Sequence, residues 1–263
     1  MRETATELDP RAAALHAYLL HRGDTGLILG QRLSAWCGHG PVLEQDIALT
    51  NVALDLVGQA RNYYQYAARL AADDDVSEDT YAYWRNDGDF TNPLLCEVDN
   101  GDWGRTLMRQ FLHDQYHFPL LEALRESADE HLGAIAAKSL KEVAYHRRYS
   151  ADWVVRLGDG TDESHARMQT ALGELWRYTG ELLTSAPVDL AAAEWGLAPK
   201  PETLAGEYDA RVRAVLTKAT LEVPDVPAVA MRTGGKSGRH SEALGFLLAE
   251  LQHLHRSHPG ATW

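Results

Sequence analysis

The chain has 263 residues, and its 25 lysines and arginines against 38 aspartates and glutamates give a net charge of −13, which argues against nucleic acid or an anionic membrane as partner. Its hydrophobic fraction of 45% and charged fraction of 24% are ordinary for a globular protein and exclude a disordered or fibrous chain. The two cysteines, Cys37 and Cys96, lack metal-binding spacing, so neither a disulfide framework nor a thiolate zinc site is expected.

Residue types that favour helices dominate the composition. The chain contains 37 alanines and 36 leucines but only 14 valines and 3 isoleucines, so it is predicted to be all-α. No segment reaches the roughly 18 consecutive apolar residues of a membrane span, and the N-terminus is too charged for a secretory signal. A cytoplasmic location without membrane contact is therefore expected.

Two long helices are predicted in the first third of the chain. Over residues 11–36 leucines recur at helical spacing after Pro10, while Gly23 and Gly26 are expected to loosen this helix. The second helix is predicted over residues 44–72, where apolar residues again mark one face.

An irregular crossover separates this pair of helices from a second pair. Residues 86–100 contain glycine, proline and several asparagines and aspartates, and a short helix is expected before them at 80–84. Two more long helices are predicted over 103–127 and 131–157. Two long helices, a long connection and two further long helices have the connectivity of a ferritin-like four-helix bundle, with its core at about 11–157.

Additional helices are predicted after the bundle, in the region of about 163–258. They are expected over residues 163–184, 201–221 and 240–257. The proline- and glycine-containing link 222–239 is expected to be an extended surface arm. Because no shift in composition divides the chain, residues 1–263 are predicted to form a single ferritin-like helical domain.

The predicted bundle can be compared with the ligand pattern of a di-iron bundle. Such a site takes a glutamate from each of two helices and a Glu-x-x-His pair from each of the other two. Inward carboxylates are available on the four long helices at Asp24, Asp55, Asp114 and Glu142. All four carboxylate positions of the pattern could therefore be filled.

The histidine positions of the pattern are not filled. Three residues after Asp55 stands Gly58, and three residues after Glu142 stands Tyr145. Three of the four carboxylates are also aspartates, which are shorter than the usual glutamates. His117 and His146 lie nearby in the sequence and could compensate in part.

Three interpretations of these residues remain open. The first is a vestigial set of ligand-like residues that form a buried polar cluster without metal, because buried carboxylates need hydrogen-bond partners. The cluster would contain Asp24, Asp55, Asp114, His117, Glu142 and His146, with Gln59 and either Arg61 or Lys138 as partners. The second is a working metal site, and the third is a solvated groove.

Two other motif-like strings are weaker. The run Gly234-Gly235-Lys236-Ser237 resembles the end of a phosphate loop, but the first glycine of that motif would stand at position 230, which is Ala230. The literal Glu250-x-x-His253 pair has no second pair to match it. Neither string is expected to bind a ligand.

Several long strings resemble the C subunits of bacterial phenylacetyl-CoA epoxidases, which are also called ring 1,2-phenylacetyl-CoA monooxygenases. The resemblance covers the chain from about Leu29 to Leu251, in order. The strings are LGQRLSAWCGHGPVLEQDIALTNVALDLVGQARNYYQYAA, FTNPLLCEVDNGDWGRTLMRQFLHDQYHF, AAKSLKEVAYHRRYSADWVVRLGDGT, LWRYTGELL and RTGGKSGRHSEALGFLLAEL.

The resemblance implies a structural, non-catalytic ferritin-like subunit without catalytic residues, metal or cofactor of its own. It implies a related catalytic A subunit that holds the di-iron centre and epoxidises the substrate ring with O2. A small B subunit and a reductase, which carries a flavin and an iron–sulfur cluster and takes electrons from NADPH, complete the implied complex. When isolated, the chain could form a homodimer.

We expect a broad face that includes helices 11–36 and 44–72 to contact the catalytic subunit. Two alternatives of other classes stay open at this point. One is a self-sufficient di-iron carboxylate oxidase or iron-binding ferritin-like protein, and the other is a helical module that binds an acyl-CoA or another protein.

Overall fold

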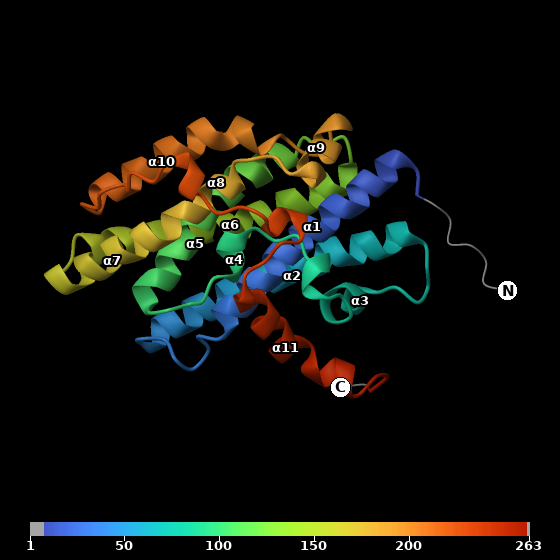
Figure 1. Cartoon of the computed structure of the whole chain (residues 1–263), viewed down its shortest axis with the longest axis horizontal. Coiled ribbons are helices and arrows are strands. Elements are labelled where there is room, and N and C mark those ends of the chain that lie inside the picture. Colours follow the sequence, from blue (N-terminus) through green and yellow to red (C-terminus); the bar gives the residue numbers. More distant parts are fainter. Residues whose placement is uncertain (1–7, 262–263) are drawn as a thin grey trace.

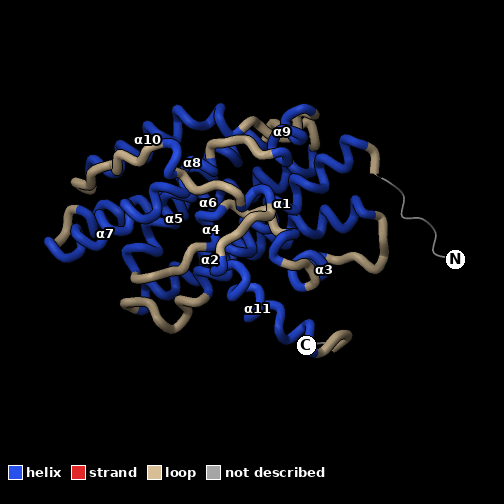
Figure 2. Tube along the Cα trace, in the orientation of Figure 1, coloured by secondary structure: helices blue, strands red, loops and turns tan. Residues whose placement is uncertain are grey.

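The computed structural model describes residues 8–261, which form helices and loops without a strand (Figures 1 and 2). Four long helices form a ferritin-like bundle, and both predictions, the all-α class and the bundle, are confirmed. They are α1 (Pro10–Ser34), α2 (Leu43–Ala71), α5 (Trp103–Leu124) and α6 (Glu130–Gly158). The hairpins α1–α2 and α5–α6 pack together through α2 and α6.

Aspartates begin three of these helices. Asp9 accepts a hydrogen bond from the amide of Ala12 at 2.9 Å, and Asp102 and Asp129 cap α5 and α6 in the same way. Each cap satisfies a backbone N–H that has no partner inside the helix. These caps place the helix starts close to the positions that the sequence predicts.

The glycines of α1 bring two helices together and do not loosen the helix, so that expectation was wrong. A Cβ atom on Gly23 would lie 2.3 Å from the ring of Tyr64, and one on Gly26 would lie 2.9 Å from the carbonyl oxygen of Leu56. The helix is continuous, and from His21 to Gly30 every residue is buried. This stretch of α1 cannot form the contact face that we expected it to share with the second helix.

Short helices lie in the crossover between the two hairpins. They are α3 (Glu78–Tyr83), the 3-10 turn Asp87–Asp89 and α4 (Leu94–Glu97). Arginines from the bundle hold the last part of the crossover: Arg32 donates to the carbonyl of Glu97 at 2.6 Å, and the fully buried Arg109 donates to that of Val98 at 2.7 Å. Burial, together with the charge of Arg32, lowers the pKa of Arg109 to about 9.

The C-terminal helices are more broken than the sequence predicts. They are α7 (Asp162–Leu175), α8 (Thr179–Leu182), α9 (Pro187–Glu194), α10 (Ala205–Lys218) and α11 (Glu242–Ser257), with 3-10 turns at Trp176–Tyr178, Pro201–Leu204, Ala228–Ala230 and Gly235–Ser237. The predicted helix 163–184 is interrupted, because the 3-10 turn Trp176–Tyr178 separates α7 from α8. Helix α9 was not expected from the sequence.

Part of the link 222–239 is buried, so the predicted surface arm is wrong for residues 234–236. The ammonium of Lys236 lies 2.9 Å from a carboxylate oxygen of Asp189 and donates to the carbonyl of Thr184 at 3.0 Å. The carboxylate of Glu181 accepts a hydrogen bond from the backbone amide of Gly234 at 2.7 Å. These bonds fix the link against α8 and α9.

The N-terminal end of α11 is anchored by a buried carboxylate that the sequence analysis did not single out. Glu97 accepts hydrogen bonds from Asn92, from the amide and hydroxyl of Ser241, and from Nδ1 of His240 at 2.7 Å. The other ring nitrogen of His240 lies 2.8 Å from the carbonyl of Phe90. Both ring nitrogens face acceptors, so the protonated imidazolium satisfies both contacts.

This anchor predicts a pH-dependent stability. Burial alone would lower the pKa of His240, but its bonds to Glu97 and Phe90 outweigh burial and raise it. A raised pKa in the folded state contributes stability that is fully present below about 6.5 and is lost as pH rises through the raised value. We expect urea unfolding between pH 6 and pH 9 to show that the difference in free energy of unfolding between the wild type and His240→Gln becomes smaller as the pH rises. Parallel curves for the two proteins would contradict the proposed ion pair.

No helix within residues 8–261 has both the length and the apolar composition needed to cross a membrane.

Candidate functional site

The interior of the bundle contains a group of buried polar side chains, which we call the interior cluster. All four long helices contribute to it. Its members, each at most 3% exposed, are Arg22, Tyr63, His113, Asp114, His117 and His146. Buried groups of this kind are retained for a hydrogen-bonding, electrostatic or functional reason, because burial without partners is unfavourable.

Asp114 is held by neutral donors. One carboxylate oxygen accepts a hydrogen bond from the side-chain amide of Gln110 at 2.7 Å, and the other accepts one from the hydroxyl of Ser150 at 2.8 Å. Nδ1 of His113 lies 3.7 Å from the same carboxylate. Asp114 therefore points inward, as the sequence predicts, and it is satisfied by its neighbours on α5 and α6.

Asp55 and Glu142 lie at the edge of the cluster, where α2 meets α6. Nε2 of His146 lies 2.9 Å from Asp55, whose side chain is 37% exposed. Glu142 is half-buried and accepts a hydrogen bond from the side-chain amide of Gln59 at 2.9 Å. The prediction that Gln59 is a hydrogen-bond partner of these residues is therefore confirmed.

The two predicted cationic partners lie elsewhere. Arg61 pairs with Glu78 on the surface at 3.3 Å, and Lys138 is exposed. No hydrogen bond within residues 8–261 links either cation to the interior cluster, so these expectations were wrong.

Asp24 belongs to a different network, which divides the predicted cluster into two parts. It accepts hydrogen bonds from the hydroxyl of Tyr64 at 2.6 Å and the amide of Thr91 at 2.8 Å, and it forms a close ion pair with Arg85. Asp24 and Arg22 are two positions apart, so they point about 200° apart around the helix axis. Since Arg22 faces the histidines of α5, Asp24 faces the crossover.

The histidines of α5 are neutral. The rings of His113 and His117 lie 5.0 Å apart, and their nitrogens have no hydrogen-bond partner among residues 8–261. Burial, followed by the unfavourable interactions of a protonated His117 with His113 and Arg22, holds the pKa of His117 well below its ordinary value. Burial likewise lowers the pKa of His113, although Asp114 opposes this effect. Two unprotonated imidazoles therefore lie beside a buried guanidinium.

The buried position of Arg22 was not expected from the sequence. Burial opposes its charge, but the neighbouring hydroxyls of Tyr18 and Tyr63 raise its pKa, so it remains a cation. A signal for its position was present, because Arg22 continues the helical spacing of Leu15 and Leu19 and so lies on the inward face of α1. Arginine on a helix is usually exposed, which is why the spacing was not followed to this residue.

These residues do not fit a di-iron ligand set. Within residues 8–261, no three histidine, cysteine, aspartate or glutamate side chains are grouped so that they could hold a metal ion. Asp24 is occupied by Arg85, Tyr64 and Thr91. The guanidinium of Arg22 also places a permanent positive charge beside His113 and His117, which opposes the binding of a divalent cation there.

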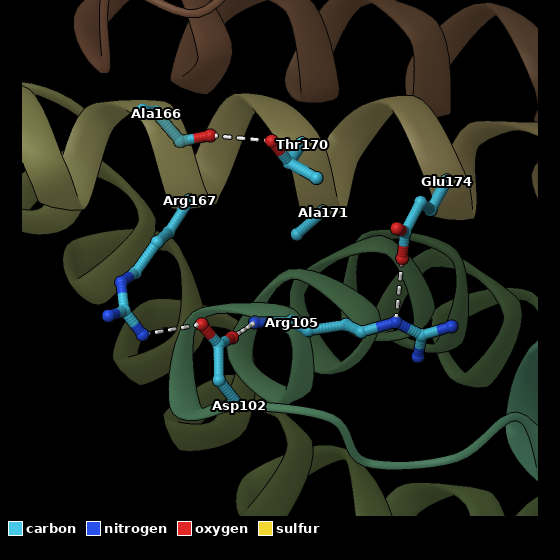
Figure 3. A pocket seen from close by; sticks show the side chains of 7 residues that line it. All are labelled: Asp102, Arg105, Ala166, Arg167, Thr170, Ala171 and Glu174. Carbon is cyan, nitrogen blue, oxygen red and sulfur yellow. Dashed lines mark hydrogen bonds and ion pairs between the residues drawn. The ribbon is translucent and has the colours of Figure 1, made fainter.

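A surface groove of about 410 Å³ lies between the start of α5 and α7 (Figure 3). Its lining consists of Asp102, Arg105, Ala166, Arg167, Thr170, Ala171 and Glu174. Both arginines are already paired, Arg105 with Glu174 at 3.0 Å and Arg167 with Asp102 at 3.2 Å (Figure 3). The groove therefore offers little to attract an anionic substrate.

The fold and the interior cluster define a ferritin-like bundle protein whose core holds buried polar side chains, of which Asp114 and His146 are hydrogen-bonded to neighbours. The sequence profile described as "Phenylacetic acid catabolic protein" matches residues 1–263, so the chain belongs to this family. A relative in Escherichia coli (strain K12), the C subunit of 1,2-phenylacetyl-CoA epoxidase, is 49% identical over 249 residues. The alignment covers 95% of this chain and 99% of the relative.

Proposed function

We propose that this chain is a non-catalytic, structural subunit of an epoxidase that acts on phenylacetyl-CoA in phenylacetate degradation. The carrying observation is its similarity to the E. coli C subunit along almost the whole of both chains. The interior cluster supports a non-catalytic role, because the positive charge of Arg22 opposes a metal ion beside His117, and Asp24 is bound to Arg85 in a separate network.

We further propose that the metal and redox groups belong to other subunits. A related catalytic A subunit would hold the di-iron centre, a small B subunit would join the assembly, and a reductase with flavin and an iron–sulfur cluster would supply electrons from NADPH. The cytoplasm suits such a chain, because Cys37 and Cys96 are both free thiols.

A bundle without metal can assist catalysis by packing against the subunit that holds it. Ligands to a metal need support from their surroundings to keep their geometry. The buried networks around Asp24, Glu97 and Asp189 make this bundle a fixed body for that purpose. Its contribution would then be to hold the helices of the catalytic subunit.

Co-expression with the catalytic A subunit tests the proposal. We expect a stable complex in which epoxidation of phenylacetyl-CoA requires both chains. After separation, iron should be found with the catalytic subunit, and this chain should remain metal-free after incubation with ferrous iron in air. About two irons per chain, as in a di-iron bundle, lost in an Asp114→Ala/Glu142→Ala double variant, would instead support the self-sufficient oxidase.

A further inference from the structure

Helix α11 is attached to the molecule by one side only and projects from the bundle (Figure 1). Its buried residues are Leu244, Leu248 and Gln252. On the other side, Phe246 is 74% exposed and Leu254 is 46% exposed. Large exposed apolar side chains grouped on one helix mark an interaction surface more often than isolated ones do.

Several polar bonds hold this helix in place. Gln252 donates to the carbonyls of Ala82 and Arg85 at 3.0 Å, and Arg256 donates to that of Tyr83 at 2.9 Å. Together with the Glu97 anchor, these bonds fix both ends of α11. The exposed apolar residues are therefore presented on an ordered helix, which lowers the entropy lost when a partner binds.

A groove adjoins α11, and α2 carries a second apolar stripe. The groove, of about 350 Å³, separates it from the end of α1 and is lined by Gln31, Arg32, Ser34, Ala35, Phe246, Leu247, Glu250 and Leu251. On α2, Leu43, Ile47 and Leu54 are all exposed and follow helical spacing along one stripe. The N-terminal half of α2 and α11 lie on the same side of the molecule (Figure 1).

We call this region the α2–α11 surface, defined by Leu43, Ile47, Leu54, Phe246 and Leu254 together with the groove between the end of α1 and α11. Packing at Gly30 supports its continuity, because a Cβ there would lie 3.2 Å from the carbonyl of Ala53. The last turns of α1, which form one wall of the groove, therefore lie beside the part of α2 that carries Leu54.

The charges around this surface are mainly negative. The first turn of α2 carries Glu44 and Asp46, and residues 43–60 contain no lysine or arginine; the third carboxylate in this stretch, Asp55, faces His146 on α6. On α11, Glu242 and Glu250 are exposed. The nearby cations Arg32 and Arg256 are already used, because both donate to backbone carbonyls and Arg32 also pairs with an aspartate.

This charge distribution decides between two kinds of partner. In a symmetric contact with a second copy, the same carboxylates would face one another across the interface, which is unfavourable. A different chain with lysines or arginines around an apolar helix would match both the apolar residues and the acidic border.

We propose that the α2–α11 surface binds an apolar helical surface, bordered by basic side chains, on another subunit of the epoxidase. This inference rests on the proposed function, since it names the face through which the subunit is held. It assigns contacts to α2 and α11 and none to the buried middle of α1.

The test measures the affinity of this chain for its co-expressed epoxidase partners by biolayer interferometry. Phe246→Glu and, independently, Leu43→Glu should weaken the complex at least about tenfold, as for a central apolar interface residue. Leu190→Glu is the matched control, because Leu190 is 49% exposed on α9, on the opposite side of the molecule (Figure 1). The control should bind like the wild type.

Charge gives a second readout on the same complex. Glu250→Lys should weaken binding, and raising the salt concentration should weaken the wild type more than this variant. Circular dichroism of every variant checks that the fold is retained, and Leu43→Glu tests the surface without touching α11.

The outcomes separate the two proposals. If the wild type does not assemble with the epoxidase partners, the proposed function fails. If it assembles but Phe246→Glu and Leu43→Glu bind like Leu190→Glu, the surface assignment is wrong and the function stands. A wild-type homodimer in sedimentation that Phe246→Glu dissociates would show that a second copy occupies this surface, which overturns the assignment.

Discussion

Replacing Asp24 by alanine is expected to lower the free energy of unfolding by about 3–5 kcal/mol, the usual effect of removing one partner from a buried ion pair. The carboxylate is fully buried, and the guanidinium of Arg85 beside it is largely buried. Without Asp24, this cation would lose its counter-charge. The hydroxyl of Tyr64 and the amide of Thr91 would also lose their acceptor.

Urea denaturation measures this effect, and an exposed aspartate provides the control. Asp74→Ala, in the exposed acidic run after α2, should leave the free energy of unfolding nearly unchanged. If Asp24 were instead a metal ligand, its loss would change the iron content more than the stability of the iron-free chain. A stability of Asp24→Ala equal to that of Asp74→Ala would contradict the network described above.

The bundle was predictable because its helices are long and strongly periodic. Long helices average the apolar pattern over many turns, and Asp9, Asp102 and Asp129 are caps that act locally. The C-terminal errors have a tertiary origin. Residues 234–236 look like a flexible polar link by composition, but Lys236 is buried because a partner for it, Asp189, lies on a helix that the sequence did not predict.

The interior cluster was predictable only in part, for a related reason. The sequence correctly pointed Asp114 inward, and Gln59, expected as a partner of the cluster, is hydrogen-bonded to Glu142. Which neighbouring element each buried residue of α1 contacts, however, depends on how the other elements pack around that helix. Because α1 is buried on all sides from His21 to Gly30, both Arg22 and Asp24 are inside the protein, and only the structure shows that they face different neighbours.

A second large effect is expected at the buried pair of Lys236 and Asp189. The variant Lys236→Met should lose about 3–5 kcal/mol of unfolding free energy, because it leaves the Asp189 carboxylate buried without its cation. The double variant Lys236→Met/Asp189→Leu should be more stable than Lys236→Met alone, since it removes both charges. Chemical denaturation of the wild type, Lys236→Met, Asp189→Leu and the double variant measures the coupling free energy between the two side chains.

The dependence on pH separates this charge effect from a loss of packing. Burial alone would raise the pKa of Asp189, but His21 and Lys236 outweigh it and lower the pKa in the wild type. The wild-type pair therefore contributes stability that is lost as pH falls from about 3.9, the pKa of an unfolded aspartate, through its own lowered value.

In Lys236→Met the charge and the hydrogen bond of Lys236 are gone while the effect of burial remains, so the pKa of Asp189 should rise and the carboxylate should take up a proton at a higher pH than in the wild type. We expect the stability deficit of Lys236→Met to shrink as pH falls from 7 towards 5, because a neutral carboxyl is less unfavourable when buried. A deficit that stays constant over this range would indicate that Lys236 acts through the packing of its side chain, and the ion pair would not be what fixes the link against α9.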